Sequence, residues 1–333
     1  TTAEWMMNIG MFMSLGAGAL MALSSRCAML MAVNGFINGE IIEELASQVG
    51  GMIGYAIDGE RGQAIGEMTF GFVGGFLGGR SSRAHPVDVA TGELFAIETD
   101  FALPGPLPLV FTRHWMSASH QNGEAGEMGW KWHHSLDMRL IRPDDMRVIM
   151  LRHEDGHIGF FPVPQRGHPS MNVIDREIQT QTDTPMGRGY AVTSYDGISH
   201  HFAPDPRDRT AFLLHRISDR NGNAITLFRD DNGHLTGIRD SAGRDLAVTT
   251  NRQGWITRIA APAPEGEGLM SLVSYDYSPQ GDMIAATDAR GNAMRYDYAA
   301  HLLIRETRRG GTVYHFRWDD PLLATRARCV ESW

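Results

Sequence analysis

Four consecutive stretches decide the fold: Asp219–Phe228 (DRNGNAITLF), Asp230–Asp240 (DDNGHLTGIRD), Asp240–Thr249 (DSAGRDLAVT) and Asn251–Ala260 (NRQGWITRIA). Each begins with a polar turn sequence that contains glycine and continues as a short run of apolar and polar residues. Glycine supplies the left-handed backbone that a tight hairpin turn needs, and short runs between turn signals are typical of β-strands. The stretches therefore predict successive β-hairpins.

The turn positions recur at nearly constant spacing. Gly222, Gly233, Gly243 and Gly254 are 11, 10 and 11 residues apart, and Gly281, Gly291, His301 and Gly311 follow at steps of ten after an insertion containing PAPEGEG. Such repetition predicts an array of turn-plus-strand units that bury their apolar positions against neighbouring units. The apolar positions are Ile225, Leu227, Leu235, Ile238, Ile256 and Ile259.

Individual turn residues carry their own predictions. His301 replaces glycine and indicates a different or strained turn. Asp219, Asp240 and Asp288 precede turns, where short carboxylate side chains accept backbone N–H groups. We therefore interpret these aspartates as turn residues and not as a paired-carboxylate catalytic site.

Composition excludes several classes of protein. The chain has 333 residues, and 42% of them are hydrophobic, which is too many for a disordered chain. A net charge of −9 argues against binding of nucleic acid through its phosphates. The two cysteines, Cys27 and Cys329, are too few for a disulfide scaffold or a cysteine-based metal site.

The first 80 residues differ from the rest. Trp5 to Ser25 contains no charge and is long enough to cross a bilayer core, and Gly62 to Gly79 is a second apolar stretch, interrupted by Glu67. The first stretch lacks the basic start of a signal peptide. These features predict a helical leader that inserts in a membrane or is covered by a chaperone. A pair of buried glycine-rich helices in a soluble protein is the alternative.

Small residues recur at every fourth position of both apolar stretches. On a helix they form one stripe along which another backbone approaches closely. We therefore predict that the chaperone or membrane contacts this stripe, which consists of Gly10, Ser14, Gly18, Ala22, Gly71, Gly75 and Gly79.

The sequence His153-Glu154-Asp155-Gly156-His157 spells HExxH, a zinc-binding pattern that works on a helix. Asp155-Gly156 is instead a hairpin turn signal, with strand-like residues on both sides. We therefore expect a turn in which the two histidines diverge, and no metal site. The adjacent pairs His133-His134 and His200-His201 point to opposite faces of a strand, so neither pair can chelate one ion by itself.

Aromatic residues are concentrated between residues 101 and 132: Phe101, Phe111, Trp115, Trp130 and Trp132. A carbohydrate-binding platform is one interpretation. A core that closes the end of a β-structure is the favoured one, because aromatic side chains dominate core burial. The sequence contains no phosphate-binding loop and no convincing nucleophile motif, so we predict no enzyme, no catalytic residue and no cofactor.

Several motifs together resemble one family. Tyr275-Asp276-Tyr277 and Tyr296-Asp297-Tyr298 resemble the YD repeats of Rhs (rearrangement hotspot) and teneurin-like proteins. Pro86–Trp115, Gly126–Leu140 and Leu213–Leu227 look like characteristic segments of Rhs shells. The resemblance covers about residues 85–333 and is to the N-terminal portion of a type VI secretion Rhs effector.

This resemblance implies a mainly β fold, in which a YD-repeat hairpin array forms part of a hollow Rhs shell after the α-helical hydrophobic leader. It implies three parts: residues 1–80 as the leader, 86–212 as the segment leading into the shell, and 213–333 as a truncated wall of YD repeats. We expect the apolar face of the wall to face enclosed cargo. Trp333 falls inside a further strand unit, so we expect the natural protein to be longer.

The implied function is that of a structural carrier of a secreted polymorphic toxin. Its partners would be an Eag-type chaperone on the leader, a VgrG-type secretion spike, the C-terminal toxin cargo of the same protein and the target-cell membrane, with no nucleic acid. The protein would be made in the bacterial cytoplasm and secreted by the type VI system, after which the leader would insert in the target membrane. The alternative is a surface-anchored carbohydrate-binding or adhesive YD-repeat protein.

Overall fold

The computed structural model describes residue 87 and residues 92–117, 126–144, 147–164, 168–263, 268–320 and 327–333. The chain divides into two units, Thr1–Arg80 and Ser81–Trp333, and the described residues all belong to the second. The predicted leader and its small-residue stripe lie outside the described residues. In the part of the chain that the structure describes, no helix has the length and apolarity needed to span a membrane.

All regular elements of the described residues are strands, which confirms the mainly β prediction for this part of the chain. Three strands form a small sheet: β1 (Phe95–Leu103), β2 (Leu109–Met116) and β3 (Trp132–His134). The others form the large sheet: β4 (Arg139–Ile141), β5 (Val148–Arg152), β6 (Ile158–Pro162), β7 (Ser170–Asn172), β8 (Glu177–Thr184), β9 (Gly187–Thr193), β10 (Ser199–Pro204), β11 (Ala211–Ser218), β12 (Ala224–Arg229), β13 (Leu235–Arg239), β14 (Asp245–Thr250), β15 (Ile256–Pro262), β16 (Leu269–Tyr277), β17 (Met283–Asp288), β18 (Ala293–Ala299), β19 (Leu302–Thr307), β20 (Val313–Trp318) and β21 (Cys329–Ser332).

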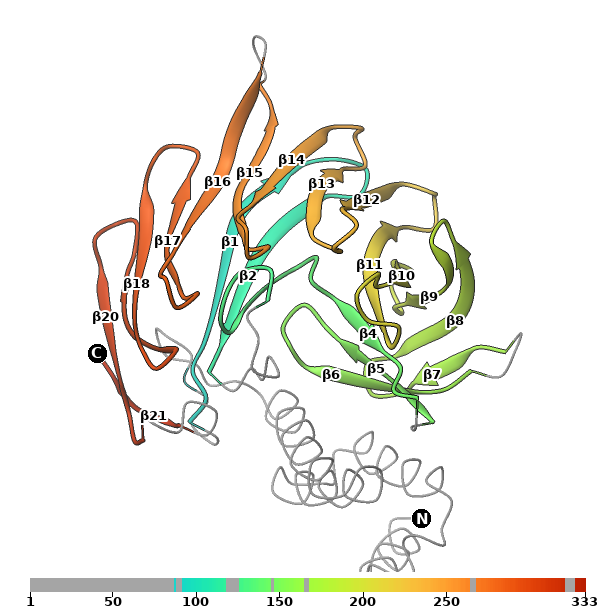
Figure 1. The fold of residues 1–333 in the computed structure, drawn as a ribbon, viewed down its shortest axis with the longest axis horizontal. Helices are drawn as coiled ribbons and strands as arrows, with labels where there is room; N and C mark the ends of the chain where they lie inside the picture. The colour runs from blue at the N-terminus through green and yellow to red at the C-terminus, as the bar shows by residue number, and fades with distance from the viewer. Residues whose placement is uncertain are drawn as a thin grey trace, which may run out of the picture. The chain divides into compact units, whose positions relative to one another are not determined.

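The large sheet closes on itself, and strand β11 is its branch point. Residues 211–213 of β11 pair with β4, whereas residues 216–218 pair with β12. Strands β4 to β11 therefore wind around a closed ring, and β12 to β20 continue from it as a curved row (Figure 1). The strand pairings in the described residues are antiparallel, and most join strands that are consecutive in the chain, as an array of hairpins requires.

The repeat turns have the predicted chemistry. Gly222 has φ +86°, and the Asp219 carboxylate accepts the backbone N–H groups of Asn221 and Asn223. The same arrangement recurs at Asp240 and Asp288, which confirms the turn role of the three aspartates. The turn at His301 differs as predicted: Ala299 pairs with Leu302, and both residues between them have positive φ.

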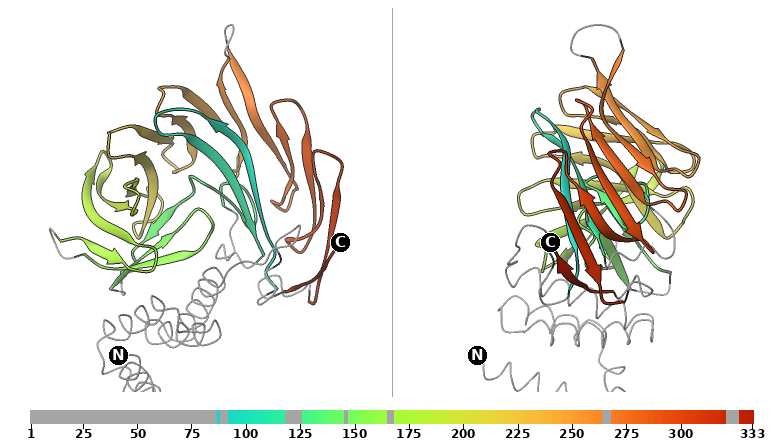
Figure 2. Two further views of the ribbon diagram at one scale, coloured as in Figure 1. Left: turned by 180° about the vertical axis from the view of Figure 1, so that it is seen from behind. Right: turned by 90° about the vertical axis from the view of Figure 1, so that its left-hand side faces the viewer.

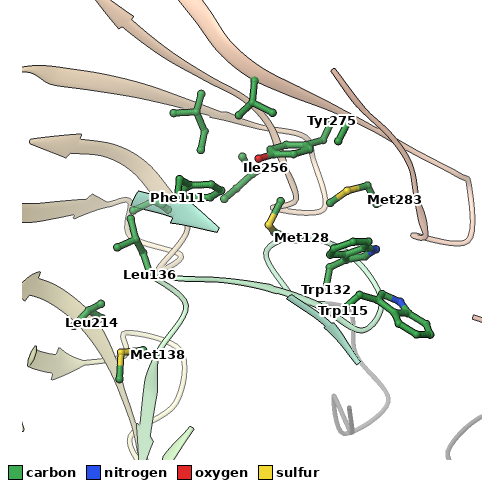
Figure 3. Close-up of a cluster of buried hydrophobic side chains, with 14 of the residues drawn as sticks. Phe111, Trp115, Met128, Trp132, Leu136, Met138, Leu214, Ile256, Tyr275 and Met283 are labelled. Atoms are coloured by element: carbon green, nitrogen blue, oxygen red, sulfur yellow. The ribbon is translucent and has the colours of Figure 1, made fainter. Parts of the chain in front are cut away.

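The predicted apolar positions of the repeats are buried: Ile225, Leu227, Leu235, Ile238, Ile256 and Ile259. They belong to one hydrophobic core with residues of the small sheet, shown in part in Figure 3. Strands β1 and β2 lie against strands of the curved row (Figures 1 and 2), and β1 contacts β16 directly. Here the expectation that the apolar face of the repeats would face cargo is wrong, because the chain's own small sheet covers it.

Candidate functional site

A buried charged cluster joins the small sheet to the repeat strands. We call it the Arg113 cluster, and its members are Asp100, Arg113, Trp132, Tyr275, Tyr296 and Arg309. Asp100 occupies a β-bulge of β1, where the register with β2 shifts between Thr99 and Phe101. A bulge re-aims a side chain, and here Asp100 faces Arg113 with both side chains fully buried.

Asp100 binds partners from both sheets. It accepts two hydrogen bonds from the Arg113 guanidinium, at 2.6 Å from Nε and 3.1 Å from Nη2, and one of 2.5 Å from the Tyr275 hydroxyl. Burial and the charge of Asp100 raise the pKa of Tyr275 well above its ordinary value, so this tyrosine stays a neutral donor. Arg309 lies 3.5 Å from the same carboxylate.

The guanidinium of Arg113 is held against aromatic rings. Its Nη1 atom donates to the Tyr296 hydroxyl at 3.3 Å, and its Cζ atom lies 4.8 Å from the centre of the Trp132 ring. Trp132 in turn donates to the Tyr298 hydroxyl at 2.9 Å. Tyrosines of both YD motifs therefore bind side chains of the small sheet, and the cluster holds the small sheet against the repeat strands.

The aromatic segment is core, as favoured from the sequence. Trp115, Trp132 and Phe111 are fully buried, and Phe101 stacks on Phe111 with ring centres 5.3 Å apart. Trp130 is half-buried, and its indole N–H donates to the carbonyl of Gln280. The three fully buried rings cannot offer a flat surface to a sugar, so they do not support the carbohydrate platform.

A second polar cluster forms at the HExxH sequence. The predicted turn is confirmed: it joins β5 to β6, Gly156 has φ +89°, and the His153 N–H donates to the His157 carbonyl at 2.9 Å. The expectation that the histidines diverge is wrong, because their rings stack with centres 3.9 Å apart. Residues directly opposite each other across a hairpin share one face of the sheet, and these two are the first such pair outside the turn.

Two carboxylates from the next hairpin complete what we call the His153–His157 cluster, which consists of His153, Asp155, His157, Asp175 and Glu177. Asp175 lies before β8 and Glu177 begins it. Asp175 Oδ1 is 3.5 Å from His157 Nε2, Asp175 Oδ2 is 3.8 Å from His153 Nε2, and Glu177 Oε2 is 3.5 Å from His153 Nε2. The sequence interpretation missed both carboxylates.

The ionisable groups of this cluster have different protonation states. Burial and the neighbouring His157 lower the pKa of His153 to about 3. Burial also lowers the pKa of His157, but hydrogen bonds to Asp155 and Asp175 outweigh it and raise the value to about 10. Burial and the charge of Asp175 raise the pKa of Glu177 to about 8. Without an ion at neutral pH, His153 is therefore neutral, while His157 and Glu177 carry protons.

The other histidine pairs do not converge, as predicted. His133 faces Asp137 at 3.5 Å, whereas His134 faces Glu127 at 3.0 Å. Both of these rings are buried. His201 contacts the Ser218 hydroxyl at 2.9 Å, and burial lowers the pKa of His200 to about 4.

A family described as "Domain of unknown function (DUF6531)" matches residues 84–161, which contain the small sheet and the HExxH turn. The solved structure of TcdB2-TccC3 aligns with 69% of this chain and 17% of that chain, at 10% identity and a TM-score of 0.36.

Curated relatives match most of the chain. "Double-stranded DNA deaminase toxin A" of Burkholderia cenocepacia is 26% identical over 284 residues, covering 80% of this chain and 18% of that protein. "Toxin protein Tse5" of Pseudomonas aeruginosa is 26% identical over 280 residues, covering 70% of this chain and 20% of that protein. "Probable deoxyribonuclease RhsA" of Dickeya dadantii is 28% identical over 265 residues, covering 74% of this chain and 16% of that protein.

The chain thus spans a fifth or less of the length of these three toxins. The family match at residues 84–161 includes the small sheet, and the three relatives each align with 70% or more of this chain. Together, these matches support an Rhs-family protein at low sequence identity.

Proposed function

We propose that this chain is the wall and leader of a toxin carrier, and that the toxic chemistry belongs to another part of the same protein. One observation carries the proposal: the described residues form a continuous array of hairpins whose core is sealed by the chain's own small sheet. Such a sheet is suited to enclosing a cargo, since its strands leave few unpaired edges.

The relatives' names support the proposal that the carrier and the toxic activity are separate parts of the protein. Most of this chain aligns with a DNA deaminase toxin, at 80% coverage, and most of it also aligns with a probable deoxyribonuclease, at 74% coverage. Deamination of a base and cleavage of a phosphodiester need different catalytic groups. A segment common to both proteins is therefore better suited to a carrier role than to either reaction.

Delivery is a further part of the proposal. The carrier would be loaded on a VgrG-type spike and exported by the type VI secretion system. Residues 1–80 would be held by an Eag-type chaperone before export and would insert in the target-cell membrane afterwards. The apolar length of this leader and its small-residue stripe support such a role.

A secretion assay in the producing bacterium tests the route. The complete encoded protein, carrying an epitope tag, would be followed in culture supernatants of the parent strain and of a strain whose secretion sheath cannot contract. We expect the tagged protein in the supernatant of the parent strain alone. Equal amounts in both supernatants would contradict type VI delivery.

The chaperone is tested separately by pull-down with the complete protein and with a form that lacks residues 1–80. Recovery of the chaperone only with the complete protein is the expected result. Equal recovery of the chaperone with both forms would place its binding site elsewhere.

A further inference from the structure

We propose that the His153–His157 cluster is a binding site for a divalent transition-metal ion of the zinc class. His153, His157 and Asp175 would be ligands, with Glu177 as the fourth. One imidazole or carboxylate atom from each of the first three residues lies within 4.8 Å of the others. Imidazole and carboxylate are the ligand types that zinc accepts in tetrahedral sites.

The distances in the cluster fit such an ion. Tetrahedral zinc with bonds of about 2.0–2.2 Å holds its ligand atoms roughly 3.4 Å apart. The pair His157 Nε2 and Asp175 Oδ1 and the pair His153 Nε2 and Glu177 Oε2 are each 3.5 Å apart. His153 Nε2 and Asp175 Oδ2 are 3.8 Å apart. Small side-chain movements would bring these atoms around one ion.

Two buried atoms in the cluster call for a ligand. Within the described residues, His153 Nε2 and Glu177 Oε2 are buried and have no hydrogen-bond partner. His153 and Glu177 are both more than nine-tenths buried. Buried polar atoms are almost always paired, so an unpaired nitrogen and an unpaired carboxylate oxygen that face each other are unusual. A cation between them would pair both.

The backbone leaves room on one side of the cluster. At Gly159 on β6, a Cβ atom would lie 3.0 Å from His153 Nε2 and 2.9 Å from Asp175 Oδ2. It would also lie 2.7 Å from the amide nitrogen of Asn172. Only a glycine keeps this space open. The contacted atoms are the ends of side chains, so an added methyl group would displace the ligands without changing their identity.

Neighbouring groups already orient the proposed ligands. His157 Nδ1 lies 2.5 Å from Asp155 Oδ1, which directs Nε2 of the same ring toward Asp175. The Asn172 amide donates to Asp175 Oδ2. Metal-binding histidines usually donate their second ring N–H to a carboxylate, and ligating carboxylates are themselves hydrogen-bonded.

The arrangement differs from that of a zinc protease. Glu154, the residue that would act as base in a helical HExxH motif, is exposed on the turn. Four protein ligands would also close the coordination sphere, which is typical of structural zinc. The ion would join the β5–β6 turn to the segment before β8, and its presence does not depend on how the protein is delivered.

Metal analysis of the purified chain tests the proposal. The full chain would be prepared without chelators, and its zinc content measured by mass spectrometry before and after addition of ZnCl2. The variants are His153→Ala, Asp175→Asn and Gly159→Ala. His215→Ala, which changes a half-buried histidine outside the cluster, is the matched control. Circular dichroism would verify that each variant remains folded.

We expect about one zinc ion per chain in the wild type and in His215→Ala, and at least a tenfold loss of affinity in the three cluster variants. Co2+ should give the visible absorption of a tetrahedral site in the wild type and not in Gly159→Ala. Folded wild-type protein that binds no zinc at 100 μM ZnCl2, or binding that survives both His153→Ala and Asp175→Asn, would overturn the proposal. Either result would leave a salt bridge of protonated His157 with Asp155 and Asp175 as the cluster's role.

Discussion

The hydroxyl of Tyr275 donates a 2.5 Å hydrogen bond to the carboxylate of Asp100, although 175 positions separate the two residues in the sequence. Asp100 belongs to the small sheet and Tyr275 to the first YD motif. The buried carboxylate of Asp100 is therefore bound by residues of both sheets. The stability of the repeat strands should therefore depend on residues of the small sheet.

Loss of the Asp100 charge should be severe. Asp100→Asn leaves the fully buried Arg113 guanidinium without its anion, and breaking a buried ion pair from one side costs about 3–5 kcal/mol. Urea denaturation of the purified chain measures the free energy of unfolding. Asp245→Asn, which removes the partner of Arg239 from an exposed pair, should have little effect. Similar losses for both variants would show that Asp100 has no special role.

Removal of one hydroxyl should have a smaller effect. Tyr275→Phe keeps the ring but deletes its hydrogen bond to Asp100, and bonds to charged groups contribute about 1.5–3 kcal/mol. Tyr195→Phe is the matched control, because Tyr195 is exposed. The same denaturation experiment compares them. A Tyr275→Phe variant as stable as the control would contradict the claim that this hydrogen bond stabilises the contact between the two sheets.

Glu306 should make stability depend on pH. Burial raises the pKa of this carboxyl from 4.5 to about 7, with Glu98 adding to the shift and the cations Arg308 and Arg113 opposing it. Between pH 4.5 and about pH 7, the folded state keeps the proton on Glu306, whereas the unfolded chain has released it. The stability from this group is thus full below pH 4.5 and falls as the pH rises to about 7.

Substitution by glutamine tests this dependence. Glu306→Gln should match the wild type near pH 4.5 and exceed its stability at pH 8 by up to about 3 kcal/mol. The gain is smaller by the free energy of the ion pair between Glu306 and Arg308, which the substitution removes. Glu331→Gln, at an exposed glutamate paired with Arg317, is the control. Parallel pH profiles for the wild type and Glu306→Gln would refute the prediction.

One repeat turn isolates the backbone requirement. A Cβ at Gly222 would meet no atom within 4 Å, so Gly222→Ala tests only the positive φ and should cost about 1–2 kcal/mol. Gly222→Asn should cost less, because asparagine tolerates this conformation. Gly310, which has open space and no positive φ, should accept alanine with little change. Equal thermal midpoints for Gly222→Ala and Gly310→Ala would contradict this assignment.

The sequence was sufficient for the features that depend on neighbouring residues. The turns at Gly222 and His301 and the aspartates before the turns follow from local backbone chemistry, so the repeat pattern predicted them. The convergence of His153 and His157 could also have been found, since residues opposite each other across a predicted hairpin share a face. Helical spacing, on which the zinc-binding pattern depends, does not describe two residues on either side of a hairpin turn.

The long-range contacts could not be predicted in this way. The bulge at Asp100 arises from the pairing of β1 with β2, and the local sequence does not predict it. Arg113, a charge in the middle of the mostly apolar strand LVFTRHWM, was a usable signal that the residue has a buried partner. Its partners from β16 and β18 depend on how the small sheet packs. Glu177 likewise reaches His153 only because successive hairpins lie side by side.

Limited proteolysis of the complete encoded protein tests the carrier account most directly. We predict that the part proposed to be toxin cargo resists protease in the wild type and in Asp245→Asn. In Asp100→Asn, where the wall has lost its buried ion pair, the same protease concentration should digest that part. Equal, rapid digestion of the cargo in all three proteins would contradict the claim that these strands enclose it.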